Sequence, residues 1–209
     1  MNNLNYNFLQ NNILNDIKNS GKSYKLLMHS CCAPCSSYCL EKVTPYFKVD
    51  VFYFNPNITC ESEYNVRLLE QKRFLLEVYK NEVGFIESEY YKNTFLNTIK
   101  GLESEKEGGS RCKLCYLLRL EETAKVAKKL GYDYFTTTLS VSPYKNAKWL
   151  NEIGEVLQNK YGVKYLYADF KKEGGYLKSI ELSKKYNLYR QDYCGCEFSK
   201  INNDKSSSI

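Results

Sequence analysis

Short apolar runs and longer amphipathic stretches alternate along this chain. The apolar runs have strand length and are rich in β-branched and aromatic residues, whereas the amphipathic stretches repeat apolar residues at helical spacing. The predicted strands cover residues 24–28, 49–54, 82–87, 133–139 and 163–170. The predicted helices cover residues 4–19, 35–44, 61–80, 93–100, 111–130, 146–160 and 171–187. Strands that alternate with helices favour an α/β fold with a doubly wound, mostly parallel sheet of about five strands.

The composition describes a single domain. The chain has 209 residues, of which 43% are hydrophobic and 26% charged, and this length is enough to bury one sound core. We expect one domain over residues 1–205 and a disordered polar tail at residues 206–209. Neither GxGxxG nor GxxxxGKS or GxxxxGKT occurs, so the sequence supports neither dinucleotide binding nor a P-loop.

Nine cysteines and a single histidine define the chemistry available to this chain. Its start shows no basic region followed by an apolar core, so we expect no signal peptide, and no apolar run is long enough to span a bilayer. We therefore expect a cytoplasmic protein, in which thiols stay reduced and clustered cysteines bind metal or do redox work. With one histidine, a metal site rests mainly on sulfur, which favours zinc or an iron-sulfur cluster.

Three cysteines follow the first predicted strand directly. Cys31, Cys32 and Cys35 lie in the segment HSCCAPCS, residues 29–36, in which Pro34 suits the start of a helix. A turn at the carboxyl end of a strand is where ligands bind in an open α/β sheet. Two adjacent thiols in that turn indicate a binding role rather than packing.

A second pair, Cys112 and Cys115, opens the predicted helix 111–130. The spacing of three puts both sulfurs on one helix face, and Ser110 is the expected N-cap. Free N–H groups and the dipole at a helix N-terminus favour thiolates. With the adjacent cysteines of the first turn, this pair makes four thiols, the number that a tetrahedral zinc ion or a 4Fe-4S cluster requires. The predicted inner face of the helix comprises Leu114, Leu117, Leu120, Ala124, Ala127 and Leu130.

The third group consists of Cys194 and Cys196 with Gly195 between them. The glycine lets the backbone bend enough for the sulfurs to meet, and a disulfide ring this small is strained, which is typical of catalytic redox pairs. Two further metal ligands are an equally good interpretation of the spacing. Cys39 and Cys60 are expected to be ordinary helix cysteines.

Several ordered motifs run through residues 25–198. They are HSCCAPCS, FYFNPNI with EYNVR, GGSRCKLCYLLRL, TTLSVSPYKN, DFKKEGGY and LYRQDYCGCEFS. In these motifs the chain resembles the QueH-type epoxyqueuosine reductases. The resemblance implies a Rossmann-like core, a 4Fe-4S cluster and an oxidoreductase of queuosine biosynthesis, a branch of tRNA processing. The implied reaction removes the epoxide oxygen of epoxyqueuosine at the wobble position of tRNA and gives queuosine.

The same resemblance implies roles for the cysteines. The implied cluster ligands are Cys31, Cys32, Cys112 and Cys115. A redox-active disulfide between Cys194 and Cys196 is also implied, and Cys35 is close enough to the turn to hold an additional iron ion. The implied partner is tRNA, bound by its anticodon loop, whereas no motif identifies the electron donor or the oligomeric state.

Two other classes of protein share part of this pattern. An ATP-dependent tRNA thiolase-like enzyme would have the fold, the cysteines and the RNA, but such enzymes resemble one another in a glycine-rich SGGxDS-like loop where this chain has HSCCAPCS. A non-catalytic, zinc-stabilised RNA-binding protein would need the four thiols but not the pair Cys194 and Cys196. An anaerobically purified protein that is brown and bleached by dithionite would exclude zinc.

Contacts to RNA and substrate are less clearly marked. The net charge of +6 permits binding to a polyanion. Residues 55–57 and 136–138 end two predicted strands beside the cysteine turn, so we expect them to line the pocket, with residues 142–145 near phosphate. The lysines expected to contact phosphate are Lys145, Lys171, Lys172, Lys184 and Lys185.

Overall fold

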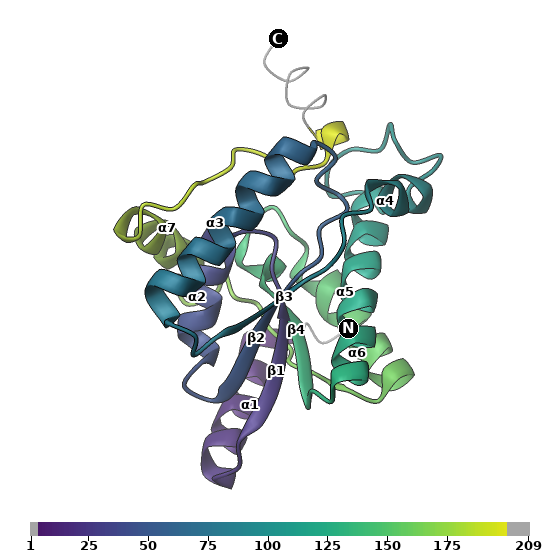
Figure 1. Cartoon of the computed structure of the whole chain (residues 1–209). Coiled ribbons are helices and arrows are strands. Elements are labelled where there is room, and N and C mark those ends of the chain that lie inside the picture. Colours follow the sequence, from purple (N-terminus) through teal and green to yellow (C-terminus); the bar gives the residue numbers. More distant parts are fainter. Residues whose placement is uncertain (1–3, 200–209) are drawn as a thin grey trace.

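The structure is a computed structural model that describes residues 4–199, and within them five strands form one all-parallel sheet (Figure 1). The strands are β1 Tyr24–His29, β2 Phe47–Tyr53, β3 Gly84–Glu87, β4 Tyr134–Thr137 and β5 Lys164–Tyr165. Their order, β3-β2-β1-β4-β5, runs outward from β1 in both directions, as in a Rossmann-like sheet. The predicted α/β class and the parallel sheet are therefore confirmed. The expected domain end at residue 205 and the tail at 206–209 lie outside the described residues.

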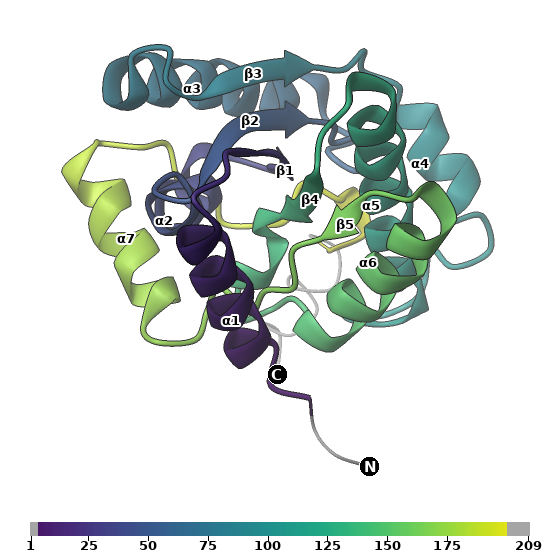
Figure 2. The same ribbon diagram turned by 90° about the horizontal axis from the view of Figure 1, so that it is seen from below.

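Helices cover both faces of the sheet (Figure 2). One face carries α1, α2 and α3, with α7 packed against α2, and the other face carries α5 and α6. The helices are α1 Tyr6–Ser20, α2 Ala33–Val43, α3 Glu61–Tyr79, α4 Lys92–Thr98, α5 Ser110–Leu130, the 3-10 helix η1 Thr138–Val141, α6 Ala147–Tyr161 and α7 Gly175–Lys185. Both faces of the sheet are thus buried, which explains the nearly continuous apolar strands of the sequence.

Alternation along β1 divides its side chains between two cores. Leu26 and Met28 pack under α1 and α2, whereas Leu27 belongs to the core under α5 and α6. His29 follows two residues after Leu27 and so shares its face, where it meets Arg119 of α5. Because side chains alternate along a strand, the single histidine of the chain lies on the side of the sheet that α5 covers.

Two α-helices begin with a side-chain N-cap. Asn5 caps α1 and Asn146 caps α6, each accepting a backbone N–H at 3.1 Å. The prediction of Ser110 as an N-cap is wrong, because Gly109 occupies that position and Ser110 is the first residue of α5. The backbone N–H of Ser110 donates instead to the carboxylate of Glu105 at 3.1 Å, so the preceding loop supplies the cap.

The predicted strand 163–170 is wrong in length. The N–H of Leu166 still donates to the carbonyl of Phe135 at 2.9 Å, but β4 passes into η1 after Thr137, and the described chain beyond Leu166 makes no further ladder with it. The side chain of Asn151 in α6 replaces the missing strand as hydrogen-bond partner: its Nδ2 donates to the carbonyl of Ala168 and its Oδ1 accepts the N–H of Ala168, both at 2.9 Å. The helix predicted to follow also starts later, at α7, because Glu173 turns the chain with φ 53.

The segment after α7 returns to the sheet. It runs from α7 past α3 and above the strands, and is drawn in yellow in Figure 1. Hydrogen bonds hold it there: Asn57 donates to the carbonyl of Cys194 (3.3 Å), and the N–H of Thr59 donates to that of Gly195 (3.1 Å). This final segment therefore lies at the carboxyl ends of the strands, beside the β1–β4 switch point where ligands bind in such sheets. No helix among the described residues is long and apolar enough to cross a bilayer.

Candidate active site

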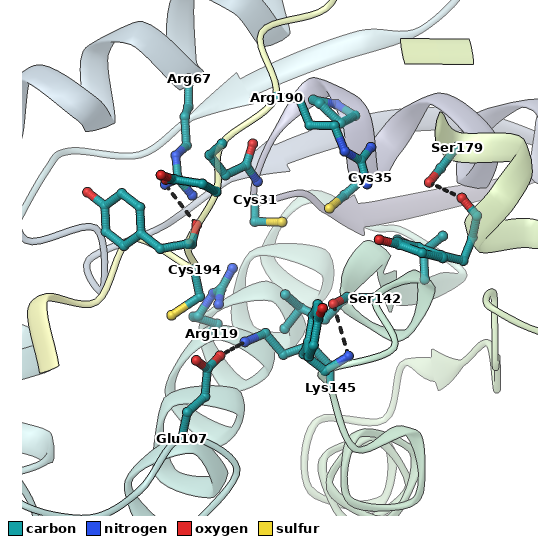
Figure 3. A pocket seen from close by; sticks show the side chains of 18 residues that line it. Cys31, Cys35, Arg67, Glu107, Arg119, Ser142, Lys145, Ser179, Arg190 and Cys194 are labelled. Carbon is teal, nitrogen blue, oxygen red and sulfur yellow. Dashed lines mark hydrogen bonds and ion pairs between the residues drawn. The ribbon is translucent and has the colours of Figure 1, made fainter. Parts of the chain in front are cut away.

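Two adjoining hollows lie at the carboxyl ends of the strands. The larger, here called the main cavity, has a volume of about 450 Å³ and is drawn in Figure 3. Its lining includes Cys31, Cys35, Arg67, Arg119, Lys145 and Cys194. The smaller, here called the inner chamber, has a volume of about 20 Å³ and lies between α5 and the final segment. Its lining includes Asn57, Arg111, Cys112, Cys115, Tyr116, Cys194 and Cys196, and it shares Arg119 and Lys145 with the main cavity.

The turn between β1 and α2 brings three cysteines together. The sulfurs of Cys31, Cys32 and Cys35 all lie within 4.8 Å of one another, and those of Cys31 and Cys32 are 3.6 Å apart. Cys32 is the N-cap of α2 and Pro34 lies in the first turn, so strand end and helix start hold the group locally. Figure 3 shows the sulfurs of Cys31 and Cys35 turned toward each other at the wall of the main cavity.

The three thiols of this group differ in pKa because of their hydrogen bonds and their burial. Those from Cys32 and Cys35 lower the pKa of Cys31 well below its ordinary value. Burial raises the pKa of Cys32 to about 12, and the hydrogen bonds to Cys31 and Cys32 raise the pKa of Cys35. Cys32 also accepts a hydrogen bond at 2.9 Å from Nε2 of Gln191, in the final segment. The group thus favours one thiolate, stabilised by two thiols.

Four free cysteines from two distant stretches of chain line the inner chamber. Cys112 and Cys115 lie in the first turns of α5, and Cys194 and Cys196 in the final segment. A hydrogen bond from Cys196 and the ammonium of Lys145 lower the pKa of Cys194 to about 5. The same hydrogen bond raises the pKa of Cys196. A thiolate is therefore favoured at Cys194 over Cys196.

Arg119 lies where the main cavity meets the inner chamber, and it is 3% exposed. Its Nε donates to Nε2 of His29 (3.2 Å), its Nη2 to Oδ1 of Asn55 (2.8 Å), and its Nη1 approaches the sulfur of Cys115 at 3.9 Å. Burial, followed by the neighbouring guanidinium, lowers the pKa of His29 to about 3. Neutral His29 can therefore accept from Arg119 while its Nδ1 donates to the hydroxyl of Thr137 at 2.9 Å.

Arg111, one turn before Cys115, is 1% exposed and only partly satisfied. Its Nη1 donates to the carbonyl of Glu103 at 2.7 Å, but among the described residues its Nε and Nη2 have no hydrogen-bond partner. Oδ1 of Asn57 and the hydroxyl of Tyr116, which also line the inner chamber, have none either. Buried polar atoms are nearly always paired, so the N–H groups of Arg111 are donors suited to an occupant of the chamber that accepts hydrogen bonds.

Lys145 borders both hollows and its side chain is only 11% exposed. Its ammonium is 2.9 Å from Oε1 of Glu107, as drawn in Figure 3. Lys171 is also engaged, by Asp169 at 2.8 Å. Both lysines are therefore held in ion pairs, whereas Lys172, Lys184 and Lys185, the other lysines expected to contact phosphate, are exposed.

The structure distributes the predicted site residues between the two hollows. Cysteines of all three groups line them, and Cys32 lies just behind the wall, bonded to Gln191. The three sulfurs that lie within 4.8 Å of one another in the described residues are those of the first turn, and Cys112 and Cys115 are not among them. Cys39 is buried in the core and Cys60, exposed, is the N-cap of α3, so neither faces a hollow.

The polar strand ends have structural roles for the most part. Asn55 bonds Ser30 and Arg119, and Thr136 bonds the carbonyl of Leu166, so the expectation that they line the pocket is wrong. They are buried because strands of a sheet covered on both faces end inside the protein. Asn57 does line the inner chamber, and residues 142, 144 and 145 line the main cavity.

Sequence reasoning missed the two buried arginines of α5. The leucine pattern placed Leu117 and Leu130 on the inner face, but these are 36% and 48% exposed. The inner face instead carries Arg111, Cys115 and Arg119, which recur every four residues. That spacing around a cysteine is the signal that could have revealed them.

The donor set fits a sulfur-rich metal group. Both hollows are lined by free thiols, and soft sulfur ligands select zinc or iron-sulfur clusters. The chamber also offers unpaired N–H groups of Arg111, which suit the sulfides and thiolates of such a group. The cysteines of the site are therefore consistent with binding of an iron-sulfur cluster.

Fold and site together define a Rossmann-like α/β protein with a sulfur-lined centre at the carboxyl ends of its strands. The family model described as "Epoxyqueuosine reductase QueH" matches residues 26–202. The chain belongs to this family, whose members are oxidoreductases, and the resemblance stated from the motifs is confirmed.

Curated relatives agree over most of the chain. The epoxyqueuosine reductase QueH of Staphylococcus epidermidis is 45% identical over 204 residues, which cover 95% of this chain and 85% of that protein. The protein of the same name from Thermotoga maritima is 36% identical over 185 residues, covering 84% and 90%. That from Streptococcus pyogenes is 43% identical over 176 residues, covering 83% and 69%.

A solved structure supports the fold independently. The U34-tRNA thiolase NcsA from Methanococcus maripaludis, solved with its [4Fe-4S] cluster, superposes with a TM-score of 0.56. The match covers 96% of this chain and 73% of that one, at 14% sequence identity. At this identity the likeness concerns the Rossmann-like fold alone.

Proposed function

We propose how this chain carries out the reaction of its family, the reduction of epoxyqueuosine to queuosine in tRNA. The observation that carries the proposal is the gathering of cysteines from three distant stretches of chain around one buried guanidinium, that of Arg119. The main cavity, of about 450 Å³, is the binding site for the substrate nucleoside, since pockets of this size hold single small molecules.

The cysteines divide into metal ligands and a redox pair. Cys31, Cys32, Cys112 and Cys115 would hold a 4Fe-4S cluster, which supplies electrons one at a time at low potential. Cys35 lies within 4.8 Å of the first two sulfurs, where it can hold an additional iron ion. Because the inner chamber also brings Cys112 and Cys115 beside the Cys194 and Cys196 pair, a ligand set that includes the pair is the alternative to test.

The reaction needs two electrons and two protons. Two C–O bonds of the epoxide break, a C=C bond forms, and the oxygen leaves as water. The dithiol of Cys194 and Cys196 can supply both electrons together and become a disulfide, which an external reductant restores. Lys145, at the junction of the hollows beside Cys194, can stabilise the departing oxygen and give it a proton. Glu107, 2.9 Å from that ammonium and 29% exposed, connects it to solvent.

The binding surface for tRNA is proposed from charge. Lys172, Lys184 and Lys185 are exposed at the turn before α7 and at its end, and α7 supplies Tyr176 and Ser179 to the wall of the main cavity. Phosphates of the anticodon loop would meet these lysines while the wobble nucleoside enters the cavity.

The test is an assay on protein purified without oxygen. Iron, sulfide and zinc are measured, and the protein is incubated with a reductant and an anticodon stem-loop RNA carrying epoxyqueuosine, with queuosine detected by mass spectrometry of the digested RNA. The expected protein is brown and forms queuosine. Cys60→Ser is the matched control, because Cys60 is exposed and faces neither hollow. A colourless zinc protein that forms no queuosine would overturn the proposal.

A further inference from the structure

Two buried arginines flank a buried cysteine on one face of α5. Arg111 precedes Cys115 by four residues and Arg119 follows it by four, so all three point the same way. Their side chains border the inner chamber, and the two arginines are 1% and 3% exposed. The stripe therefore supplies Cys115, one of the four cysteines of the chamber, and places a buried arginine one turn to either side of it.

Neither arginine has an acidic partner among the described residues. Arg119 donates to neutral His29 and Asn55, and Arg111 donates to a backbone carbonyl and lies 5.4 Å from the ring centre of Phe198. Arg67 of α3, equally buried at the main cavity, provides the contrast because it pairs with Glu63 at 2.7 Å. A guanidinium cannot lose its proton to escape burial, so an unpaired one is costly.

The geometry points to Arg111 and Arg119 as the counter-charges of an anionic iron-sulfur group at the cysteines of the hollows, positioned to make that group easier to reduce. This inference rests on the proposed function. A thiolate-ligated cluster is anionic, and reduction adds a further negative charge. Two fixed positive charges in a dry site stabilise the reduced form more than the oxidised form. The unpaired Nε and Nη2 of Arg111 are the donors left for hydrogen bonds to its sulfur atoms.

A purely structural role is the competing explanation. Arg119 also ties α5 to the ends of β1 and β2 through His29 and Asn55, and removing it would loosen that contact. Charge and shape can be separated by substitution, because lysine keeps the positive charge but not the planar fork, whereas methionine keeps the apolar stem alone. Midpoint potential is the measurement that responds to charge and not to a loosened contact.

The experiment uses anaerobically purified, iron-loaded protein. Arg111→Met, Arg119→Met, Arg111→Lys and Arg119→Lys are compared with the parent by iron and sulfide analysis and by a dye-mediated reductive titration followed by EPR. Lys113→Met is the matched control, since it removes one positive charge from the same helix but from its exposed face. There solvent already screens the charge.

Each methionine variant is expected to shift the midpoint potential to more negative values. Each lysine variant should recover most of the shift, and Lys113→Met should leave the potential at the parent value. If a methionine variant loses its iron, retention of iron by the matching lysine variant carries the same conclusion. Parent potentials in both methionine variants would overturn the inference, as would equal loss of iron from the lysine and methionine variants. A parent protein without iron would instead refute the proposed function.

Discussion

The two sulfur groups of this site are assembled in different ways. Cys31, Cys32 and Cys35 occupy a single turn, so the end of β1 and the start of α2 bring their sulfurs within 4.8 Å of one another. The inner chamber joins α5 to the final segment, whose cysteines lie about eighty residues further along the chain. Hydrogen bonds from Asn57 and Thr59 hold the final segment to the loop between β2 and α3. The first group is thus as stable as the sheet, whereas the second is only as stable as the docking of one segment.

The largest effect is expected from the proposed ligands on α5. Structural metal sites can contribute on the order of 10 kcal/mol to folding. Cys112→Ser or Cys115→Ser should therefore lower both the iron content and the melting temperature, although neither cysteine belongs to the locally formed group. Metal analysis and thermal denaturation of the anaerobic proteins measure this, with Cys60→Ser as control. A variant with full iron and the parent melting temperature would remove that cysteine from the ligand set.

The second prediction separates redox work from metal binding within the inner chamber. Cys194→Ser and Cys196→Ser should keep the colour and the iron but lose multiple-turnover reduction, because the two-electron dithiol is gone while the proposed ligands remain. Rapid-mixing assays with limiting and excess RNA, together with iron analysis, test each variant. Colourless protein with iron lost, as in Cys112→Ser, would make the pair metal ligands.

A smaller effect is expected from the backbone that holds the pair. Gly195 has φ 97, and an added Cβ would lie 2.7 Å from Cγ1 and 3.3 Å from Cα of Ile58. Gly195→Ala should cost about 1–3 kcal/mol of local strain and loosen the final segment. Cys194 and Cys196 should then be alkylated faster by iodoacetamide, as read by mass spectrometry, while the rate at Cys31 stays unchanged.

The control for that substitution is a glycine that also has a positive φ angle but has open space around its Cα. Gly101 has φ 85 and no atom within 4 Å of an added Cβ. Gly101→Ala should therefore leave alkylation of both sulfur groups at the parent rate. Equal acceleration at Cys31 and Cys194 in the Gly195 variant would mean that the two groups open together and that the contrast between them fails.

The smallest effect lies outside both sulfur groups, on the proposed RNA surface. Each of Lys172→Ala, Lys184→Ala and Lys185→Ala should reduce the magnitude of the negative slope of log K against log salt by about 0.7 if the lysine contacts a phosphate of single-stranded RNA. Lys171→Ala is the control, because Lys171 is occupied by Asp169 at 2.8 Å. Fluorescence anisotropy with a labelled stem-loop gives the slopes, and a slope shared by all four variants and the parent would exclude this surface.

Local patterns predicted most of the fold. Strand-length apolar runs and the helical spacing of apolar residues act within a few residues, so the types of the elements and the parallel sheet could be inferred. The predictions were wrong where a residue distant in the sequence determines the local structure. β5 is short because β4 ends early, and Ser110 is not a cap because the carboxylate of Glu105 already binds its N–H. Leu117 is exposed because α5 turns its cysteine and arginines toward the sheet ends.

The sequence by itself determined that Cys31, Cys32 and Cys35 lie together after the first strand, because residues so close in the chain at a strand end cannot separate. Only the tertiary structure decided which groups face one another. It placed Cys194 and Cys196 beside α5, buried Lys145 between the hollows, and gave Arg111 and Arg119 no carboxylate partner within residues 4–199. The reason is physical: burial and unpaired charge depend on every element packed around a side chain, and no local spacing records them.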